Sequence, residues 1–267
     1  MIATPRIAAA TRSERGMRDT NQDATCVLQD DRHWLAVLAD GAGGHRDGAE
    51  ASRRAVAQVD AALHQATPSF EAGNLTRAIL AAHQRVREDV ESTGADSMHS
   101  TVVVLWIDAA RGALWSHVGD SRLYRVRGGR VDLLTVDDSV VQLLVDAGML
   151  APEEASSHPR RNQLVAALGI DDELHPHTVS LPEPIEEGDA YLLCSDGWWN
   201  AIDAAGIAQT LTQSGSPGDW LDAMCCRIES RAVPRQDNFS AIGVWIGDAG
   251  DDSEMTRPNM KALPWAA

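Results

Sequence analysis

Three apolar runs of the sequence end in the same way, with an aspartate followed by a glycine or a serine. Asp40 follows WLAVLA and precedes Gly41, Asp120 follows ALWSHVG, and Asp196 follows AYLLCS. Such aspartates are common in turns, so each of them taken alone is most simply a turn residue. Their recurrence at three strand ends is the feature that indicates chemistry.

Two further aspartates stand just before apolar runs. Asp23 precedes ATCVLQ, and Asp237 is separated from FSAIGVWI by Asn238 alone. In an antiparallel sheet the end of one strand lies beside the start of its neighbour, so Asp196 and Asp237 can share one edge. Five carboxylates would then meet at one edge of the sheet system.

Carboxylates that are placed together raise one another's pKa unless cations neutralise them. Mg²⁺ and Mn²⁺ prefer sites made of oxygen atoms and keep positions open for water. The glycine after Asp40 lets the backbone come close enough for the Gly41 carbonyl to join such a site. The pattern therefore predicts a site for divalent cations.

The glycine-rich stretch ADGAGGHRDG also resembles a phosphate-binding loop in composition. The signature G-x-x-x-x-G-K-[ST] needs a lysine, and the only lysine of the chain is Lys261. Metal binding through Asp40 is therefore the preferred interpretation. Gly43, Gly44 and Gly48 are interpreted as turn and packing residues.

Composition limits the range of partners. The chain has 39 acidic and 23 basic residues and a formal net charge of -16, so it should repel nucleic acid and anionic lipid. No apolar run reaches the roughly 18 residues of a membrane span, and MIATPRIAAATR is too short and too interrupted for a signal peptide. The four cysteines show no C-x-x-C spacing. We expect a cytoplasmic monomer with neither nucleic-acid nor membrane partners.

The apolar periodicity predicts both strands and helices. Strands are expected at 24–29, 33–39, 100–108, 113–119, 122–134 (a hairpin about Gly128–Gly129), 177–181, 190–195 and 239–247. Helices are expected at 47–65, 74–92, 139–148, 160–168, 203–213 and 218–231. Short connections favour antiparallel sheets, and the helices can cover both faces. We expect a single domain at 1–247, with a helical flap inserted at about 139–180, and a flexible tail at 248–267.

Six segments, in order, resemble the metal-dependent Ser/Thr phosphatases of the protein phosphatase 2C family in their bacterial form. They are SERGMRDTNQDA (13–24), ADGAGGHRDGAEAS (39–52), STVVVLWI (100–107), HVGDSRLYRVRGGRVDLLTVDDS (117–139), LLCSDGWWNAI (192–202) and QDNFSAIGVW (236–245). Together they span nearly all of residues 11–246. A single Asp-Gly match would be no evidence of resemblance, but six matches in the family's order are strong evidence.

The resemblance implies an α+β fold, a four-layer α-β-β-α sandwich of two antiparallel sheets flanked by helices. It also implies a centre of two Mn²⁺ or Mg²⁺ ions. Asp40 would bridge the ions and act in catalysis, and the Gly41 carbonyl would bind one of them. Asp196 and Asp237 would hold the other ion. Asp237 would also act in catalysis.

Three further residues match functional positions of the family. Asp23 would support the ions directly or through water, and Asp120 would bind a third ion together with Asp196. Arg18 would bind the phosphate, a task for which the planar guanidinium suits two oxygens at once. The catalytic set implied by the resemblance is therefore Arg18, Asp40 and Asp237.

The function implied by the resemblance is hydrolysis of phosphoserine and phosphothreonine in proteins by a metal-activated water. Phosphoproteins would be the substrates, and a Ser/Thr kinase would be the partner enzyme. The alternative is a catalytically weak or inactive member that binds phosphoproteins as a regulatory module. The presence of all the metal-binding acids favours catalysis.

The sequence departs from the family at some positions. Ala42 stands where many eukaryotic members have a histidine, and His45 is not assigned its role. Asp138 stands where bacterial relatives commonly have a histidine. Trp198 and Trp199 are interpreted as core or rim aromatics, and substrate contact is the less favoured interpretation.

Other phosphatase chemistries fit the sequence less well. The C-x5-R spacing of a cysteine phosphatase occurs at Cys26/Arg32 and Cys225/Arg231, but the residues between contain acids and no glycine. The D-x-D motif of an aspartyl-phosphate enzyme is absent. A nuclease or phosphodiesterase would need a basic and aromatic strip that this chain lacks.

Overall fold

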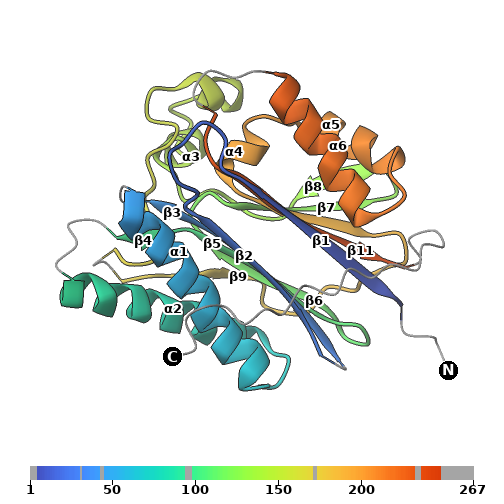
Figure 1. Ribbon diagram of the computed structural model, residues 1–267, viewed down its shortest axis with the longest axis horizontal. Helices are drawn as coiled ribbons and strands as arrows, with labels where there is room; N and C mark the ends of the chain where they lie inside the picture. Colours follow the sequence, from blue (N-terminus) through green and yellow to red (C-terminus); the bar gives the residue numbers. More distant parts are fainter. Residues whose placement is uncertain are drawn as a thin grey trace.

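Two antiparallel β-sheets stacked face to face, with helices outside each, form the computed structural model of the protein (Figure 1). The structure describes residues 5–30, 32–42, 45–93, 98–170, 173–231 and 236–247. The predicted tail at 248–267 lies outside the described residues.

The first sheet has the strand order β1-β11-β10-β7-β8. Its strands are β1 (Ile7–Glu14), β11 (Phe239–Ile246), β10 (Ala190–Cys194), β7 (Arg122–Arg127) and β8 (Arg130–Leu133). The second sheet has the order β2-β3-β5-β6-β9, and β4 pairs with β3. Its strands are β2 (Asp23–Gln29), β3 (His33–Ala42), β4 (His99–Ser100), β5 (Val102–Asp108), β6 (Gly112–Val118) and β9 (His177–Thr178).

Helices cover the outer face of each sheet. On the second sheet lie α1 (His45–Asp60), which continues into a π-helical turn (Ala61–Gln65), and α2 (Ala72–Thr93). On the first sheet lie α5 (Ala204–Thr212) and α6 (Pro217–Ser230). Shorter pieces are α3 (Val140–Asp146), a 3₁₀ helix (Pro152–Ser157) and α4 (Asp196–Trp199). No helix in the described parts of the chain is both long and apolar enough to cross a bilayer.

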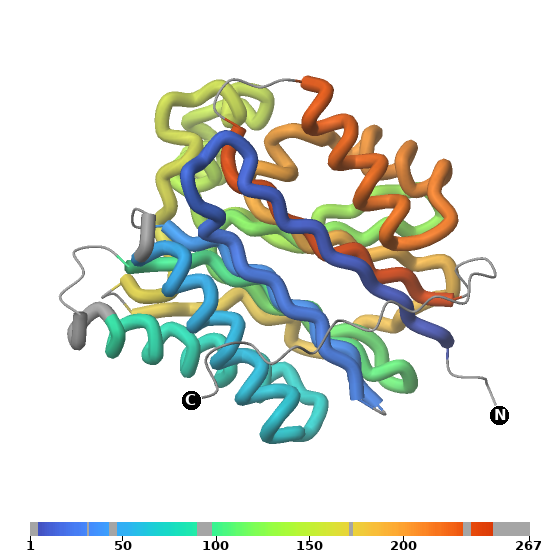
Figure 2. Tube along the Cα trace, in the orientation of Figure 1, coloured from blue at the N-terminus to red at the C-terminus, as the bar shows by residue number. Residues whose placement is uncertain are grey.

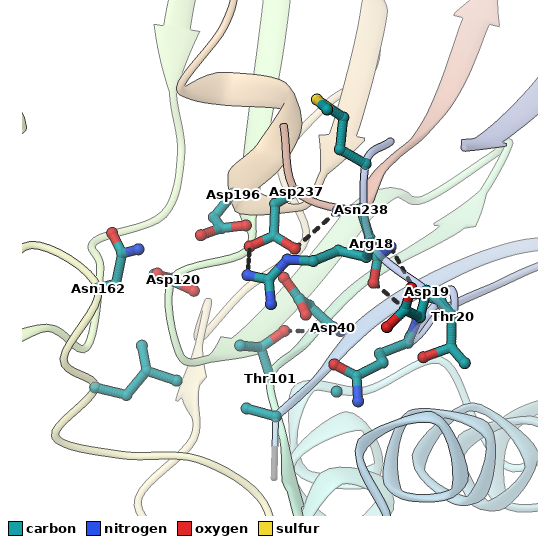
Figure 3. Close-up of a pocket in the computed structure, with 15 residues that line it drawn as sticks. Arg18, Asp19, Thr20, Asp40, Thr101, Asp120, Asn162, Asp196, Asp237 and Asn238 are labelled. Carbon is teal, nitrogen blue, oxygen red and sulfur yellow. Dashed lines mark hydrogen bonds and ion pairs between the residues drawn. The ribbon is translucent and has the colours of Figure 1, made fainter. Parts of the chain in front are cut away.

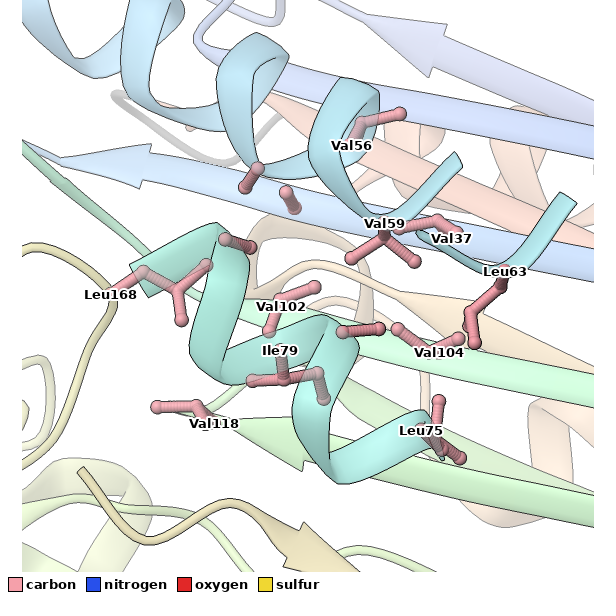
Figure 4. Close-up of a cluster of buried hydrophobic side chains, with 14 of the residues drawn as sticks. Val37, Val56, Val59, Leu63, Leu75, Ile79, Val102, Val104, Val118 and Leu168 are labelled. Carbon is pink, nitrogen blue, oxygen red and sulfur yellow. The ribbon is translucent and has the colours of Figure 1, made fainter. Parts of the chain in front are cut away.

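Side-chain alternation along the strands builds three apolar layers. On β3, Leu35 and Val37 face α1 and α2, whereas Ala36 and Leu38 face the other sheet. Figure 4 shows the layer under α1 and α2, where Val37 lies beside Val59. Equivalent layers fill the space between the sheets and the space under α5 and α6. The predicted four-layer sandwich is confirmed.

Several elements differ from the sequence prediction. Neither α4 nor the 3₁₀ helix was expected, and β9 covers only His177–Thr178 of the strand predicted at 177–181. Strand β1 was not expected, and it pairs along its whole length with β11. The predicted helix at 160–168 is wrong, because its backbone groups bond to other segments. The Val165 amide donates to the Asp138 carbonyl at 2.9 Å, and the Leu168 amide donates to the Ser100 carbonyl at 2.8 Å. The region of the proposed flap thus holds α3, a 3₁₀ helix, β9 and irregular backbone.

The end of β3 and the first turns of α1 approach each other closely through two glycines. A Cβ built on Gly41 would lie 1.9 Å from the Gly48 carbonyl oxygen. A Cβ on Gly48 would lie 2.8 Å from Gln22 Nε2 and 2.9 Å from the Gly41 carbonyl oxygen. The interpretation of Gly48 as a packing residue is therefore confirmed.

We expect Gly48→Ala to destabilise the protein, although glycine to alanine inside a helix ordinarily stabilises by up to about 1 kcal/mol. The reason is the contact with Gln22 and Gly41. Gly73→Ala in α2 is the matched control, since a Cβ there meets only Arg77 Nη1 at 3.5 Å. Urea unfolding should show a lower free energy of unfolding for Gly48→Ala than for Gly73→Ala. Equal values would contradict the packing argument.

Candidate functional site

The predicted carboxylates meet at one end of the sandwich, around a pocket of about 530 Å³ (Figure 3). Asp40, Asp120, Asp196 and Asp237 line this pocket together with Gly41. Asp23 lies opposite Asp40 in the β2–β3 pairing. The prediction that these residues share one edge is therefore confirmed.

Strand register explains the convergence. β10 and β11 are antiparallel, with Cys194 opposite Ala241, so Asp196 after β10 comes beside Asp237 before β11. Asp120 lies in the turn between β6 and β7, that is, between the two sheets. Asp120, Asp196 and Asp237 thus stand just outside strand ends, whereas Asp23 is the first residue of β2 and Asp40 lies two residues before the end of β3.

Asp40 is held through its backbone. Its amide donates to Thr101 Oγ1 at 3.0 Å. Its carbonyl accepts from the Thr101 amide at 2.8 Å and from Ser100 Oγ at 2.9 Å. These three hydrogen bonds fix the backbone while the carboxylate lines the pocket.

Burial and mutual repulsion disturb the titration of these groups. Burial raises the pKa of Asp23 to about 6, of Asp120 to about 7 and of Asp196 to about 8. The pKa of Asp40 is raised well above its usual value, first by burial and then by the charge of Asp23. The negative charge of Asp120 adds to the effect of burial on the pKa of Asp196. A cation in the pocket would remove this cost.

Arg18 is the cation that the chain itself brings to the acids. Its Nη2 forms an ion pair with Asp237 Oδ2. Asp40, Asp120 and Asp196 have no ion-pair partner among the residues that the structure describes. Among the described residues that line the pocket, one guanidinium therefore stands beside five aspartates, Asp19 included, which leaves negative charge uncompensated.

The residues fit a hard divalent cation. The donors are carboxylate and carbonyl oxygens, which Mg²⁺ and Mn²⁺ prefer. Asp23 Oδ1 is buried and accepts no hydrogen bond within the described ranges, whereas Oδ2 accepts from Ser195 Oγ at 2.9 Å. No three His, Cys, Asp or Glu side chains in those ranges already stand as a ligand set for one ion. Carboxylate rotation would therefore accompany binding.

Trp199 and Arg122 support the turn that carries Asp120. Trp199 Nε1 donates to the Asp120 carbonyl at 2.9 Å, and the Arg122 guanidinium lies 3.6 Å from the Trp199 ring centroid. Arg122 also makes two hydrogen bonds to Asp137, at 2.9 and 2.8 Å. Trp198 is fully buried in the core under α6. The interpretation of the two tryptophans as core or rim residues is confirmed.

Asp138, the residue that departs from the family pattern, has a defined set of partners. Its Oδ2 accepts from the Gly119 amide at 2.9 Å, and its Oδ1 lies 2.8 Å from His177 Nε2. It thus connects β9 to the residue just before Asp120. Ala42 lines the pocket, and the side chain of His45 lies outside the described part of the structure.

The cysteine alternatives find no support. Burial raises the pKa of Cys26 to about 11 and of Cys225 to about 12, so both thiols are neutral near pH 7. Neither cysteine lines the carboxylate pocket.

Several residues of the site had not been singled out from the sequence. Asn162 and Leu164 reach the pocket from the segment after the 3₁₀ helix, and Met17 and Asn238 also line it. Asn162 is exposed in a loop, and the sequence around it has no motif that marks it as a site residue. Asn238 stands next to Asp237 in QDN, and this adjacency is the one signal that points to it.

The fold and the pocket agree with the class of metal-dependent phosphatases that the sequence resembles. The family model described as protein phosphatase 2C matches residues 12–218, and the chain belongs to this family. It is similar to the serine/threonine phosphatase stp of Listeria innocua, with 30% identity over 240 residues that cover 88% of this chain and 94% of that protein.

A second relative is the serine/threonine protein phosphatase PstP of Mycobacterium tuberculosis. It is 37% identical over 205 residues, which cover 76% of this chain and 38% of that longer protein. A solved structure of the PstP catalytic domain in complex with two manganese ions is also similar. Its TM-score is 0.78 at 29% identity, covering 91% of this chain and 99% of that one.

In the absence of divalent cations, we expect stability to fall as the pH rises from about 4 to about 8. Asp196 ionises near pH 4 when unfolded and near pH 8 when folded, so the folded state binds more protons in this range. Asp196→Asn removes this loss. In urea unfolding at pH 8 with EDTA, the free energy of unfolding of Asp196→Asn should therefore exceed that of the unsubstituted protein by more than about 1 kcal/mol.

Asp189→Asn is the control for this experiment. Asp189 is buried, with 1% of its surface exposed, but it accepts from Arg127 Nε and Nη2 at 2.6 Å each. Loss of that pair should destabilise the protein by about 3 kcal/mol. A destabilised Asp196→Asn would contradict the interpretation of the pocket charge.

Proposed function

We propose that the chain hydrolyses phosphoserine and phosphothreonine in proteins with the help of two Mn²⁺ or Mg²⁺ ions. The observation that carries the proposal is the pocket of partly or fully buried carboxylates, of which Asp40, Asp120 and Asp196 have no ion-pair partner among the described residues. Family membership and the manganese-bound PstP structure support it.

The residues have distinct tasks in this proposal. Asp40 would bridge the two ions, the Gly41 carbonyl would bind one, and Asp196 and Asp237 would bind the other. Asp23 would support the set through Oδ1, which accepts no hydrogen bond from the residues that the structure describes. When bound, the ions would supply a nucleophilic water and positive charge around the phosphate. Asp120 would hold a third ion together with Asp196.

Arg18 would bind the phosphate oxygens. Its guanidinium pairs with Asp237 at the pocket, and its side chain is 57% exposed. If Asp237 held a cation, the Arg18 guanidinium would be free to donate hydrogen bonds to a phosphate. Two parallel hydrogen bonds would orient the phosphoryl group, a geometry that lysine cannot reproduce.

A nucleophile from the protein finds little support. Among the described residues that line the pocket there is neither cysteine nor histidine. Thr101 Oγ1 is already engaged with the Asp40 amide and with Ser121 Oγ at 2.7 Å. Direct attack by water is therefore the preferred route.

The partners follow from the names of the relatives and from charge. The Listeria innocua relative is named a serine/threonine phosphatase, and phosphoproteins and a Ser/Thr kinase are the proposed partners here. A net charge of -16 opposes nucleic acid and anionic membranes. We propose a cytoplasmic monomer with one domain at 1–247. The alternative, a phosphoprotein-binding module without turnover, uses the same pocket.

We expect Asp40→Asn to lose metal binding and activity together while the fold is kept. Hydrolysis of p-nitrophenyl phosphate and of a phosphothreonine peptide should depend on Mn²⁺ and stop on addition of EDTA. In Asp40→Asn the rate should fall by at least about 100-fold, because one metal-binding charge is lost. Circular dichroism should show an unchanged fold.

Asp222→Asn is the matched control, since Asp222 pairs with Arg12 on the exposed surface. It should keep full activity. A folded, metal-loaded protein that turns over neither substrate would favour the phosphoprotein-binding module instead.

A further inference from the structure

Asn238 follows Asp237 and reaches into the loop at 15–22 that joins β1 to β2 and carries Arg18. We propose that Asn238 is a positioning residue that fixes this loop, so that only the Arg18 side chain moves to bind phosphate. The inference rests on the proposed phosphate-binding role of Arg18.

The side chain of Asn238 spans the loop with three hydrogen bonds. Its Nδ2 donates to the Arg15 carbonyl at 2.8 Å and to the Thr20 carbonyl at 2.9 Å. Its Oδ1 accepts from the Gln22 amide at 2.9 Å. Asn238 is only 4% exposed. Both donors and the acceptor of one amide therefore bind backbone groups on either side of Arg18.

A close backbone contact fixes the same loop independently. The Met17 amide donates to the Gln236 carbonyl at 2.9 Å. Gly16 has φ +60, and a Cβ built on it would lie 2.2 Å from the Asp237 carbonyl oxygen. Figure 2 shows the turn after β1, in blue, beside the start of β11, in red. The loop thus lies directly on the segment that carries Asp237.

This arrangement separates a fixed backbone from a mobile side chain. The Arg18 backbone lies between the anchored carbonyls of Arg15 and Thr20, while its guanidinium contacts Asp237. A guanidinium on a fixed backbone loses less conformational freedom when it binds phosphate. Asn238 would therefore act on phosphate affinity through Arg18, without itself touching the phosphate.

The test measures affinity for inorganic phosphate in the presence of Mn²⁺. Two readouts are used, the inhibition constant against p-nitrophenyl phosphate and the phosphate-induced rise in melting temperature, which needs no turnover. Arg18→Ala and Asn238→Ala should each lower the affinity for inorganic phosphate by about 10-fold or more, the usual effect of losing hydrogen bonds to a charged group. The Mn²⁺ concentration for half activation should stay within about two-fold for Asn238→Ala.

The double variant decides how Asn238 acts. If it works through Arg18, Asn238→Ala should cost less than about two-fold in phosphate affinity when Arg18 is already alanine. A residue with a merely structural role would cost the same in both backgrounds, and that result would overturn the inference.

Two matched controls exclude general damage. Asn74 on α2 also uses both ends of its side-chain amide, since Nδ2 donates to the Ser69 carbonyl and to Ser69 Oγ, and Oδ1 accepts from Arg77 Nη2. Asn74→Ala should leave phosphate affinity unchanged. Gly16→Ala should lower the phosphate affinity as Asn238→Ala does. Gly128→Ala should leave it unchanged, because Gly128 has φ +56 but open space around it.

The outcomes separate the two claims. If Arg18→Ala binds phosphate normally, the proposed role of Arg18 is wrong and the inference falls with it. If Arg18→Ala lowers the phosphate affinity but Asn238→Ala and Gly16→Ala do not, only the inference about Asn238 is wrong. If Asn238→Ala does not fold, the comparison of Gly16→Ala with Gly128→Ala decides.

Discussion

Repulsion among closely placed, partly or fully buried carboxylates is the constraint on which the rest of this structure depends. Asp23 and Asp40 face each other across a strand pair, and Asp120, Asp196 and Asp237 stand around the same pocket. Such an arrangement costs folding free energy unless a cation is bound. The charge pattern therefore opposes stability and favours ligand binding, as is common for functional sites.

A rigid frame is needed to keep these charges together. Three apolar layers hold the two sheets and their helices, and β3, β10 and β11 are buried on both faces. Backbone hydrogen bonds then fix each strand end, as at Asp40, and close glycine contacts bring α1 against β3. Because the frame is packed on both sides, side-chain rotation can adapt the site to ions without movement of the sheets.

Much of the site was predictable because strand ends carry a clear signal. An aspartate after an apolar run, repeated three times, locates the edge, and antiparallel pairing brings Asp196 to Asp237. Other features carry no such signal. Strand β1 reads IAAATRSE, whose small and charged residues lack strong alternation, and it forms through pairing with β11. The segment 160–168 has helical periodicity, yet its amides bond to Asp138 and Ser100, contacts distant in sequence. Likewise, the three bonds of Asn238 join residues more than 200 positions away.

The central claim is that the pocket is built for divalent cations, and calorimetric titration of the protein with Mn²⁺ tests it most directly. The account predicts that at least two ions bind per chain near pH 7, and that Asp40→Asn reduces this number. Absence of Mn²⁺ binding, or identical binding in the two proteins, would contradict the account.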